Sequence, residues 1–247
     1  MIISLCTTCM NRLEYLLQTI DININAIKIF NDNNDNQFEI SLCNYDSKDG
    51  LHEFIIDNYQ ECIDSGLLIY TKIEDKEFFS VSHAKNIAYK HSNGSVLFNL
   101  DCDNKINLNI LEYYNTIFLK DINNVYLKDM KCIGVVGISR TNFYKLGGYN
   151  EKMIGYGFED YDFHERVEKY TKCEIIKMLH SFKYDDINVI QQTVDIKYKN
   201  HNNVKPNGDI FETIYHMTYY NRGISDYYAE KNIMNPNEFE GIEFGKI

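Results

Sequence analysis

The feature that most limits the fold is an alternation of short apolar runs with helix-like segments in the first hundred residues. The apolar runs of strand length lie at residues 2–6, 38–43, 67–72 and 95–100. Segments with apolar side chains three and four positions apart separate them, at residues 12–30, 50–63 and 82–91, the last opened by Ser82 as a helix cap. This order predicts an α/β fold, with a mostly parallel central sheet flanked by helices on both faces.

The pattern continues less regularly after residue 130. Strands are expected at residues 131–139 and 173–179, and helices at 141–146, 158–170 and 209–220. Glycines crowd between the first two of these helices, at Gly147, Gly148, Gly155 and Gly157. We expect one domain over residues 1–185, with halves meeting near residue 104, and an extension over residues 186–247 packed on the same domain.

Charge and length exclude several classes of protein. The chain has 247 residues, with 36 acidic against 25 basic side chains and a net charge of −11, which disfavours binding to nucleic acid or anionic lipid. Its apolar runs are far shorter than the roughly 20 residues of a transmembrane helix, and the N-terminus lacks the pattern of a signal peptide. Seven cysteines, an odd number, favour reduced thiols. We expect a soluble, cytoplasmic protein with no transmembrane segment.

One expected strand runs directly into two aspartates in the stretch SVLFNLDCD, which ends at Asp101 and Asp103. Two carboxylates at one place need a cation or several hydrogen-bond donors, although a solvated turn is the simpler interpretation. Ligands of parallel α/β sheets bind beyond the carboxyl ends of the strands, which is where this pair would lie. Strand alternation should turn Cys102 to the opposite face.

A second acidic cluster, Glu159, Asp160 and Asp162, lies in the first turn of the helix expected at residues 158–170. Acidic side chains there also suit the helix dipole, so the cluster alone does not define a site. Glu159 shares the inward stripe of Phe163, and His180 follows the next expected strand. Together with the two aspartates, these groups indicate a Mg²⁺ or Mn²⁺ site that also binds a diphosphate, and an imidazole favours Mn²⁺.

A different interpretation starts from the stretch CTTC, in which Cys6 and Cys9 lie between an expected strand and a helix. Two thiols near a helix start are typical of dithiol redox sites, so a thiol oxidoreductase is one alternative. It predicts loss of activity on Cys6→Ser.

The residues described so far resemble those of GT-A fold glycosyltransferases, whose sheet is Rossmann-like. The segments ISLCTTCMNRLEYLLQTI, FEISLCNYDSKDG, SHAKNIA and SVLFNLDCDN are similar to family 2 glycosyltransferases. The segment GVVGISRTNFYKLGGYNEKMIGYGFEDYDFHERV resembles the C-terminal segment of the galactosyltransferases. The resemblance implies transfer of a hexose or N-acetylhexosamine from a nucleotide diphosphate sugar, by default a UDP-sugar, to an acceptor hydroxyl. The acceptor is then a glycan, a lipid-linked saccharide or a protein.

The resemblance also assigns roles on the donor side. Asp103 matches the metal ligand of these enzymes, and Asp101 matches the residue that contacts ribose and sometimes the metal. The positions expected to bind the donor are Thr7, Thr8, Arg12, Lys85, Asn86 and, for the nucleobase, Asn44 or Asp46.

On the acceptor side, Asp160 matches the proposed general base and Glu159 the neighbour that holds the acceptor sugar. Tyr156 occupies the place of a mobile tryptophan, with Gly157 beside it, and His180 matches the imidazole metal ligand, with His216 as the second choice. A base of this kind implies inversion at the anomeric carbon. A non-catalytic module that binds sugar nucleotides or glycans on the same fold is the other alternative.

Overall fold

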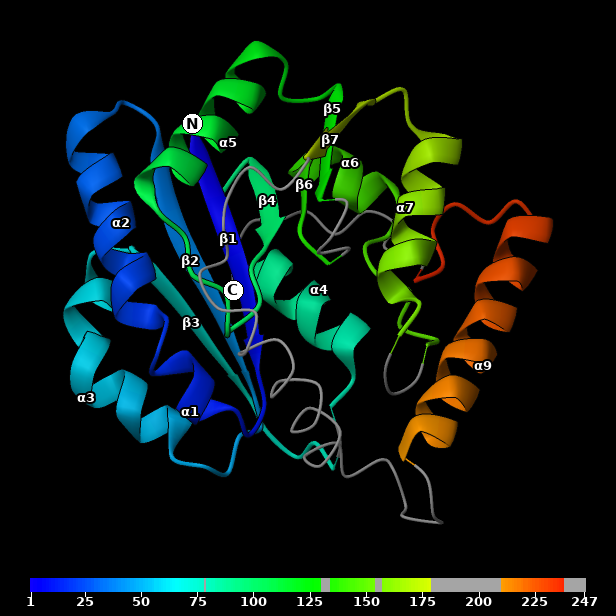
Figure 1. Ribbon diagram of the computed structural model, residues 1–247, viewed down its shortest axis with the longest axis horizontal. Coiled ribbons are helices and arrows are strands. Elements are labelled where there is room, and N and C mark those ends of the chain that lie inside the picture. Colours follow the sequence, from blue (N-terminus) through cyan, green and yellow to red (C-terminus); the bar gives the residue numbers. More distant parts are fainter. Residues whose placement is uncertain (78, 130–133, 154–156, 179–209, 238–247) are drawn as a thin grey trace.

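The computed structural model describes residues 1–77, 79–129, 134–153, 157–178 and 210–237. This part of the chain contains a seven-stranded sheet in the order β3-β2-β1-β4-β6-β5-β7 (Figure 1). The strands are β1 (Ile2–Cys9), β2 (Gln37–Tyr45), β3 (Leu68–Ile73), β4 (Val96–Asn99), β5 (Val125–Asp129), β6 (Val136–Ser139) and β7 (Glu174–Met178). Four of the six neighbouring pairs are parallel and the two that involve β6 are antiparallel, so the expected mostly parallel α/β sheet is confirmed.

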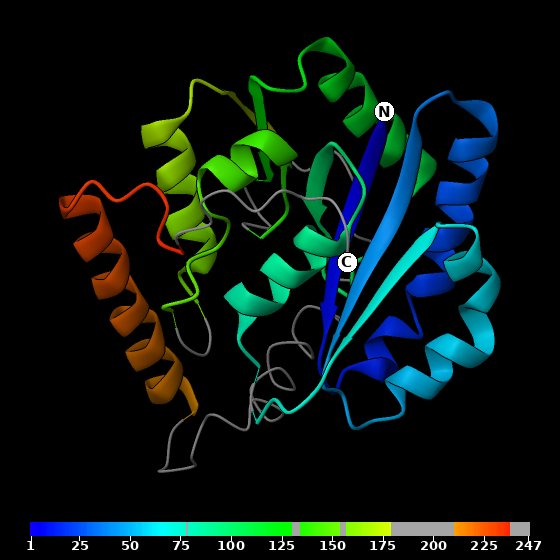
Figure 2. The ribbon, with the colours of Figure 1, turned by 180° about the vertical axis from the view of Figure 1, so that it is seen from behind.

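Helices cover both faces of the sheet, as Figures 1 and 2 show from opposite sides. One apolar core lies under α2 (Ile20–Asn33), α3 (Leu51–Asp64) and α5 (Leu108–Lys120). The other lies under α4 (Val81–His91), α6 (Arg140–Lys145) and α7 (Glu159–Tyr170). Phe163 and Val167 are fully buried in this second core and Glu159 is buried beside them, as the inward stripe predicted. The stripe thereby fixes which side of α7 faces the sheet.

The structure differs from the sequence-based elements in three places. The helix expected over residues 12–30 is two helices, α1 (Leu13–Leu16) and α2, because the backbone leaves the helical conformation at Thr19, where φ is −123°. The hydroxyl of Thr19 donates to the carbonyl of Cys102 at 2.6 Å. The predicted Ser82 cap is wrong, since α4 already begins at Val81 and Ser82 is buried inside it. Helix α5 and strand β5 lie where no element was expected.

Helix α9 (Ile210–Glu230) extends ten residues beyond the helix expected there. It packs along α7, where Ser225 donates a hydrogen bond to Asp162 at 2.9 Å, and Asn221 donates to the carbonyl of Gly157 at 2.8 Å. The boundary expected at residue 185 lies outside the described residues. The described part of the extension thus contacts both α7 and the segment that leads into it.

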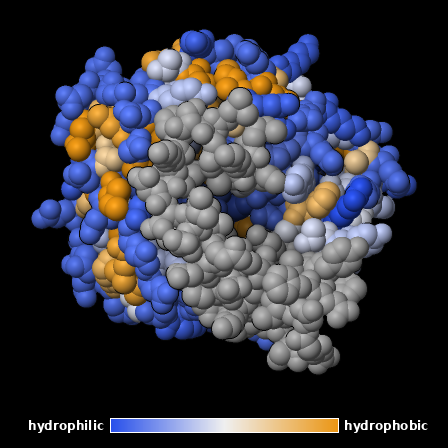
Figure 3. All heavy atoms as spheres, viewed as in Figure 1, coloured by the Kyte–Doolittle hydropathy of each residue, from blue (hydrophilic) through white to orange (hydrophobic). Residues whose placement is uncertain are grey.

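The surface in Figure 3 is mostly hydrophilic, with apolar side chains gathered at the left over α2 and α3. Exposed large apolar residues of these helices include Ile22, Ile29 and Ile56. Within the described ranges, none of the helices combines the length and the apolar character needed to cross a membrane.

Candidate active site

The turn that carries Asp101 and Asp103 begins directly after β4, at the edge where the parallel strands β1 and β2 also end. Side chains at the start of helix α2 form hydrogen bonds with the backbone of this turn. Besides the bond from Thr19 to Cys102, Asn23 donates to the carbonyl of Asn104 at 2.9 Å and accepts from the backbone N–H of Ile106 at 2.9 Å. These bonds satisfy buried backbone groups and fix the path of the turn. Cys102 is buried in the apolar core, but it lies in the turn after β4, so the strand alternation from which its orientation was predicted does not apply to it.

Asp103 pairs with Arg12, which reaches across from the loop after β1. Arg12 Nη2 lies 3.0 Å from Asp103 Oδ2, and the guanidinium lies 4.7 Å above the ring of Tyr15. Burial alone lowers the pKa of Arg12, but the charges nearby, with Asp103 and Asp101 among them, raise it overall. Its Nε is buried without a hydrogen-bond partner among the described residues. Arg12 thus brings a fixed positive charge and one unused donor to the two aspartates.

The acidic pair, Glu159 and Asp160, lies at the start of α7 and is held by a lysine from α4. Lys85 Nζ donates to Asp160 Oδ1 at 2.7 Å and to Glu159 Oε1 at 3.2 Å. Its ammonium also lies 4.8 Å from the ring centre of Tyr149. Burial lowers the pKa of Lys85, yet the carboxylates of Asp160, Glu159 and Asp101 raise it overall, so the lysine stays charged.

The two acidic clusters converge at Gly134, in the turn before β6. A Cβ added to Gly134 would lie 3.2 Å from Asp160 Oδ2 and 3.9 Å from Asp101 Oδ2. We call this position the shared point. Each carboxylate has its other oxygen engaged, since Asp160 Oδ1 accepts from Lys85 and Asp101 Oδ1 accepts from Asn99 at 3.1 Å. One oxygen of each therefore faces the same small region.

Burial, together with the neighbouring carboxylates Glu159 and Asp101, raises the pKa of Asp160 from 3.8 to about 7, although the positive charge of Lys85 opposes the rise. A carboxylate in this state exchanges its proton near neutral pH, as a general base must. The side chain remains 17% exposed, so it can be reached from outside.

The donor set fits a divalent cation of the magnesium or manganese type. Four carboxylates, Asp101, Asp103, Glu159 and Asp160, face only two cations, Lys85 and Arg12, in the contacts given above. When all four carboxylates are ionised, a bound dication would balance the two negative charges left over. Such ions take oxygen ligands and are held by one or two carboxylates with substrate phosphates, and Asp101 and Asp103 would hold it. Among the described residues, no cluster of three or more metal-binding side chains forms a complete site by itself.

Two residues expected to bind the nucleobase, Asn44 near the end of β2 and Asp46 just after it, are occupied by protein contacts. Asn44 donates to the hydroxyl of Tyr70 at 2.8 Å and accepts from the N–H of Ser47 at 2.9 Å. Asp46 accepts from Lys48 Nζ at 2.5 Å and from the N–H of Lys76 at 2.9 Å. Both therefore shape the loop after β2, and a role in reading the nucleobase stays a prediction.

Lys85 and Asn86 also lie differently from the expectation that both bind the donor. Lys85 contacts the acidic pair, and Asn86 directs its amide at the loop before α7. Asn86 Nδ2 donates to the carbonyl of Tyr149 and to Glu151, and its Oδ1 accepts from the N–H of Tyr149, all at 2.8 Å. These three bonds use the Asn86 amide within the protein, and its contact with the sugar donor stays a prediction.

The remaining predicted residues are placed as follows. Thr7 and Asp101 line one small cavity, and Thr8 is half-buried near the end of β1. Gly157 packs against α9, where its added Cβ would lie 2.6 Å from Thr218 Oγ1. Tyr156, His180 and the side chain of His216 lie outside the described residues.

The dithiol alternative does not fit the structure. Cys6 and Cys9 are an odd number of positions apart on β1, and they lie in the two different cores on opposite faces of the sheet. Burial raises the pKa of Cys6, and a hydrogen bond with Cys102 together with burial raises that of Cys9. Two inert thiols on opposite faces cannot act as a redox pair.

Thr19, Asn23, Asn99 and Gly134 were not anticipated as parts of the site. Thr19 and Asn23 have polar side chains on an otherwise apolar helix face, which is the one local signal that could have indicated them. Their partners lie more than 80 positions away, beyond the reach of a local pattern.

Comparison with known proteins gives one family segment and several similar folds. Residues 122–192 match a family model described as the N-terminal domain of galactosyltransferase. No curated protein gives a significant match to the sequence.

Solved structures share the fold at low sequence identity. The mannosyltransferase PcManGT from Pyrobaculum calidifontis, in complex with GDP-Man and Mn²⁺, has a TM-score of 0.60 and 14% identity, over 91% of this chain and 71% of that one. TarS 1–349 of S. aureus has a TM-score of 0.59 and 12% identity, over 82% of this chain. The match covers 66% of that TarS fragment. A structure of TarS 1–349 in complex with UDP-GlcNAc has a TM-score of 0.51 and 11% identity, over 82% of this chain and 68% of that one. The chain therefore has the GT-A fold of glycosyltransferases, and its residues 122–192 are similar to the N-terminal domain of galactosyltransferase.

Proposed function

We propose that this protein transfers a hexose or N-acetylhexosamine from a nucleotide diphosphate sugar to an acceptor hydroxyl, with inversion at the anomeric carbon. The observation that carries the proposal is the meeting of Asp101 and Asp160 at the shared point. One carboxylate lies at the sheet edge where α/β proteins bind nucleotides, and the other has the pKa of a base.

Asp101, Asp103 and Arg12 form the donor side of the proposed site. When bound by Asp101 and Asp103, Mn²⁺ or Mg²⁺ would offset the negative charge that develops on the leaving diphosphate. Arg12 would help to stabilise this negative charge, because its guanidinium is permanently protonated and its buried Nε–H makes no hydrogen bond within the described residues. Thr7 and Thr8, at the end of β1, are proposed to contact the nucleotide.

Asp160 and Glu159 form the acceptor side. Asp160 Oδ2 takes the proton of the acceptor hydroxyl as the acceptor oxygen bonds to the anomeric carbon. The bond from that carbon to the diphosphate oxygen breaks, and its electron pair leaves with the nucleoside diphosphate. Lys85 holds Asp160 Oδ1 and leaves Oδ2 directed at the shared point, while Glu159 is proposed to bind a hydroxyl of the acceptor sugar.

The similar folds support the class of donor. PcManGT is in complex with GDP-Man and Mn²⁺, and one TarS structure holds UDP-GlcNAc. These two structures hold different nucleobases, so the nucleobase and the sugar of this protein's donor have to be identified by experiment.

The test is a panel of UDP- and GDP-sugars with Mn²⁺, read by donor hydrolysis and by thermal stabilisation of the protein. We expect one donor to raise the unfolding temperature in the presence of the metal and to be hydrolysed slowly. NMR of the product then gives the configuration of the new bond, and retention would contradict the role of Asp160. Stabilisation by donors without hydrolysis or transfer to any acceptor would support the non-catalytic binding module instead.

A further inference from the structure

Residues 234–237, which follow α9, lie against a pair of glycines in the loop before α7. Gly147 and Gly148 have φ angles of +72° and +65°, a region that glycine adopts without strain. A Cβ at Gly147 would lie 1.9 Å from Asn235 Oδ1, and one at Gly148 would lie 2.5 Å from Asn86 Oδ1. Each glycine thus makes room for one asparagine side chain.

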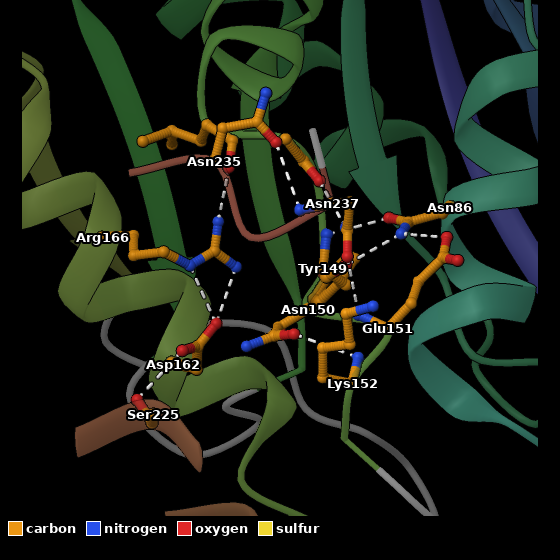
Figure 4. Close-up of polar contacts among 12 residues, drawn as sticks. Asn86, Tyr149, Asn150, Glu151, Lys152, Asp162, Arg166, Ser225, Asn235 and Asn237 are labelled. Carbon is orange, nitrogen blue, oxygen red and sulfur yellow. Dashed lines mark hydrogen bonds and ion pairs between the residues drawn. The ribbon is translucent and has the colours of Figure 1, made fainter. Parts of the chain in front are cut away.

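Asn237 makes the principal contacts from this segment. Its Nδ2 donates to the carbonyls of Gly147 at 2.6 Å and of Tyr149 at 2.5 Å, and its Oδ1 accepts from the N–H of Glu151 at 3.0 Å (Figure 4). The amide therefore holds three backbone groups of the loop at residues 147–151. Only an amide side chain can donate twice and accept once in this way.

Asn86 meets the same loop from the opposite side. The carbonyl of Tyr149 accepts from both Asn86 and Asn237, so two amides that lie far apart in the sequence fix one peptide group. Figure 4 shows Tyr149 between them. The ring of Tyr149 is fully buried and lies under the ammonium of Lys85, which in turn holds the acidic pair. A continuous set of contacts therefore leads from Asn237 to Asp160.

We propose that Asn237 is a positioning residue for the acidic pair, acting through the backbone of Tyr149 and through Lys85. This inference rests on the proposed function, because it assigns the pair a catalytic task. It gives the segment at residues 234–237 a definite role: the segment fixes where Asp160 Oδ2 points without touching donor or acceptor.

The test replaces the amide in two ways, with Asn237→Ala and with Asn237→Asp, which keeps the shape but cannot donate. Lys231→Ala, an exposed side chain in the same region, is the matched control. We expect kcat to fall between about tenfold and a hundredfold in both Asn237 variants, as small misplacements of catalytic groups do. The KM for the donor should stay unchanged, since Asn237 lies on the acceptor side, and Lys231→Ala should match the unaltered protein.

Hydrogen exchange at the amide of Glu151 supplies a readout that needs no substrate, because this N–H donates to Asn237 Oδ1. Exchange should quicken in Asn237→Ala, which removes the acceptor, and less in Asn237→Asp, which keeps one. Combination with Asn86→Ala should give a non-additive loss of kcat, because both side chains act on one carbonyl. Faster exchange with unchanged kcat would reduce the contact to a structural one and overturn the proposal, as would a rise in donor KM alone. If the unaltered protein transfers no sugar, the proposed function fails, and the exchange rates still decide whether Asn237 holds the loop.

Discussion

Lys85 donates to Asp160 across 2.7 Å although the two residues lie 75 positions apart in the sequence. The bond joins α4 to the start of α7, where Glu159 and Asp160 lie. The side chains of Lys85 and Asp160 are largely buried, with exposed fractions of 5% and 17% respectively. Loss of Lys85 therefore leaves two buried carboxylates without the cation that they share, whereas loss of Asp160 leaves Lys85 its bond to Glu159.

Lys85→Met should destabilise the protein by about 3–5 kcal/mol, since removal of one partner leaves uncompensated buried charge. Transfer should be lost as well, because nothing then orients Asp160 Oδ1. Urea unfolding measures the first effect. Lys90→Met, an exposed lysine on the same helix, is the control and should change stability little. Equal effects of the two substitutions would contradict the buried ion pair.

The transfer rate should rise with pH and level off above about 7, because Asp160 acts as a base only when ionised. In Asp160→Asn the rise of the transfer rate with pH should be absent, and the residual rate should be low. A profile that is flat from pH 5 to pH 8 in the unaltered protein would argue against Asp160 as the base.

The same raised pKa has a consequence for stability. The folded protein binds the proton of Asp160 more tightly than the unfolded chain does. The contribution of this proton to the free energy of unfolding is therefore full below pH 3.8 and is lost as the pH rises through about 7. Unfolding by urea at pH 5 and pH 8 should show a loss of stability at the higher pH that is smaller in Asp160→Asn.

Removal of divalent ions with EDTA should abolish transfer, and Mn²⁺ should restore it. Asp103→Ala should lose the stabilisation by Mn²⁺ with donor, which amounts to about 2.7 kcal/mol when the ligand is at a hundred times its Kd. Asp57→Ala, on the exposed side of α3, should keep it. Full activity of the protein in EDTA would refute the metal site.

Gly147→Ala should destabilise the protein more than Gly66→Ala. Both glycines have positive φ, +72° and +75°, so an alanine at either position meets about 1–2 kcal/mol of backbone strain. Only Gly147 also faces a neighbour, Asn235 Oδ1, at 1.9 Å from the added Cβ, while nothing lies within 4 Å of Gly66. Overpacking should add about 1–3 kcal/mol at Gly147, which thermal unfolding of the two variants will measure. Equal losses would mean that the segment at residues 234–237 does not dock there.

Thr19→Val keeps the shape of the side chain but removes the hydroxyl that bonds to the Cys102 carbonyl. A loss of about 1–3 kcal/mol in stability is expected for the unsatisfied buried group, together with weaker donor binding in the presence of Mn²⁺. The control is Thr116→Val, whose hydroxyl bonds to a carbonyl on the exposed face of α5. Donor binding that is unaffected by Thr19→Val would show that the turn holds its shape without this bond.

Most strands and helices could be predicted because their apolar residues repeat locally, and these repeats correspond to the two cores, but β5 and α5 were not expected. The break before α2 was not predicted, and Thr19, which lies at the break, bonds to a carbonyl 83 positions away, beyond the reach of a local pattern. Lys85 and Asn86 show the same limit. Their adjacency suggested one shared ligand, but the helix turns one toward the acidic pair and the other toward Tyr149. Residue types indicated which chemistry was present, whereas the partners depended on the folded chain.

The shared carbonyl of Tyr149 also bears on how the molecule is made. A ribosome releases the strands of the sheet and helix α7 well before Asn237, so a nascent chain can assemble its sheet early. The last restraint on the Tyr149 peptide arrives only after residue 237 has emerged. Maturation of catalytic competence should therefore lag behind folding of the core during synthesis.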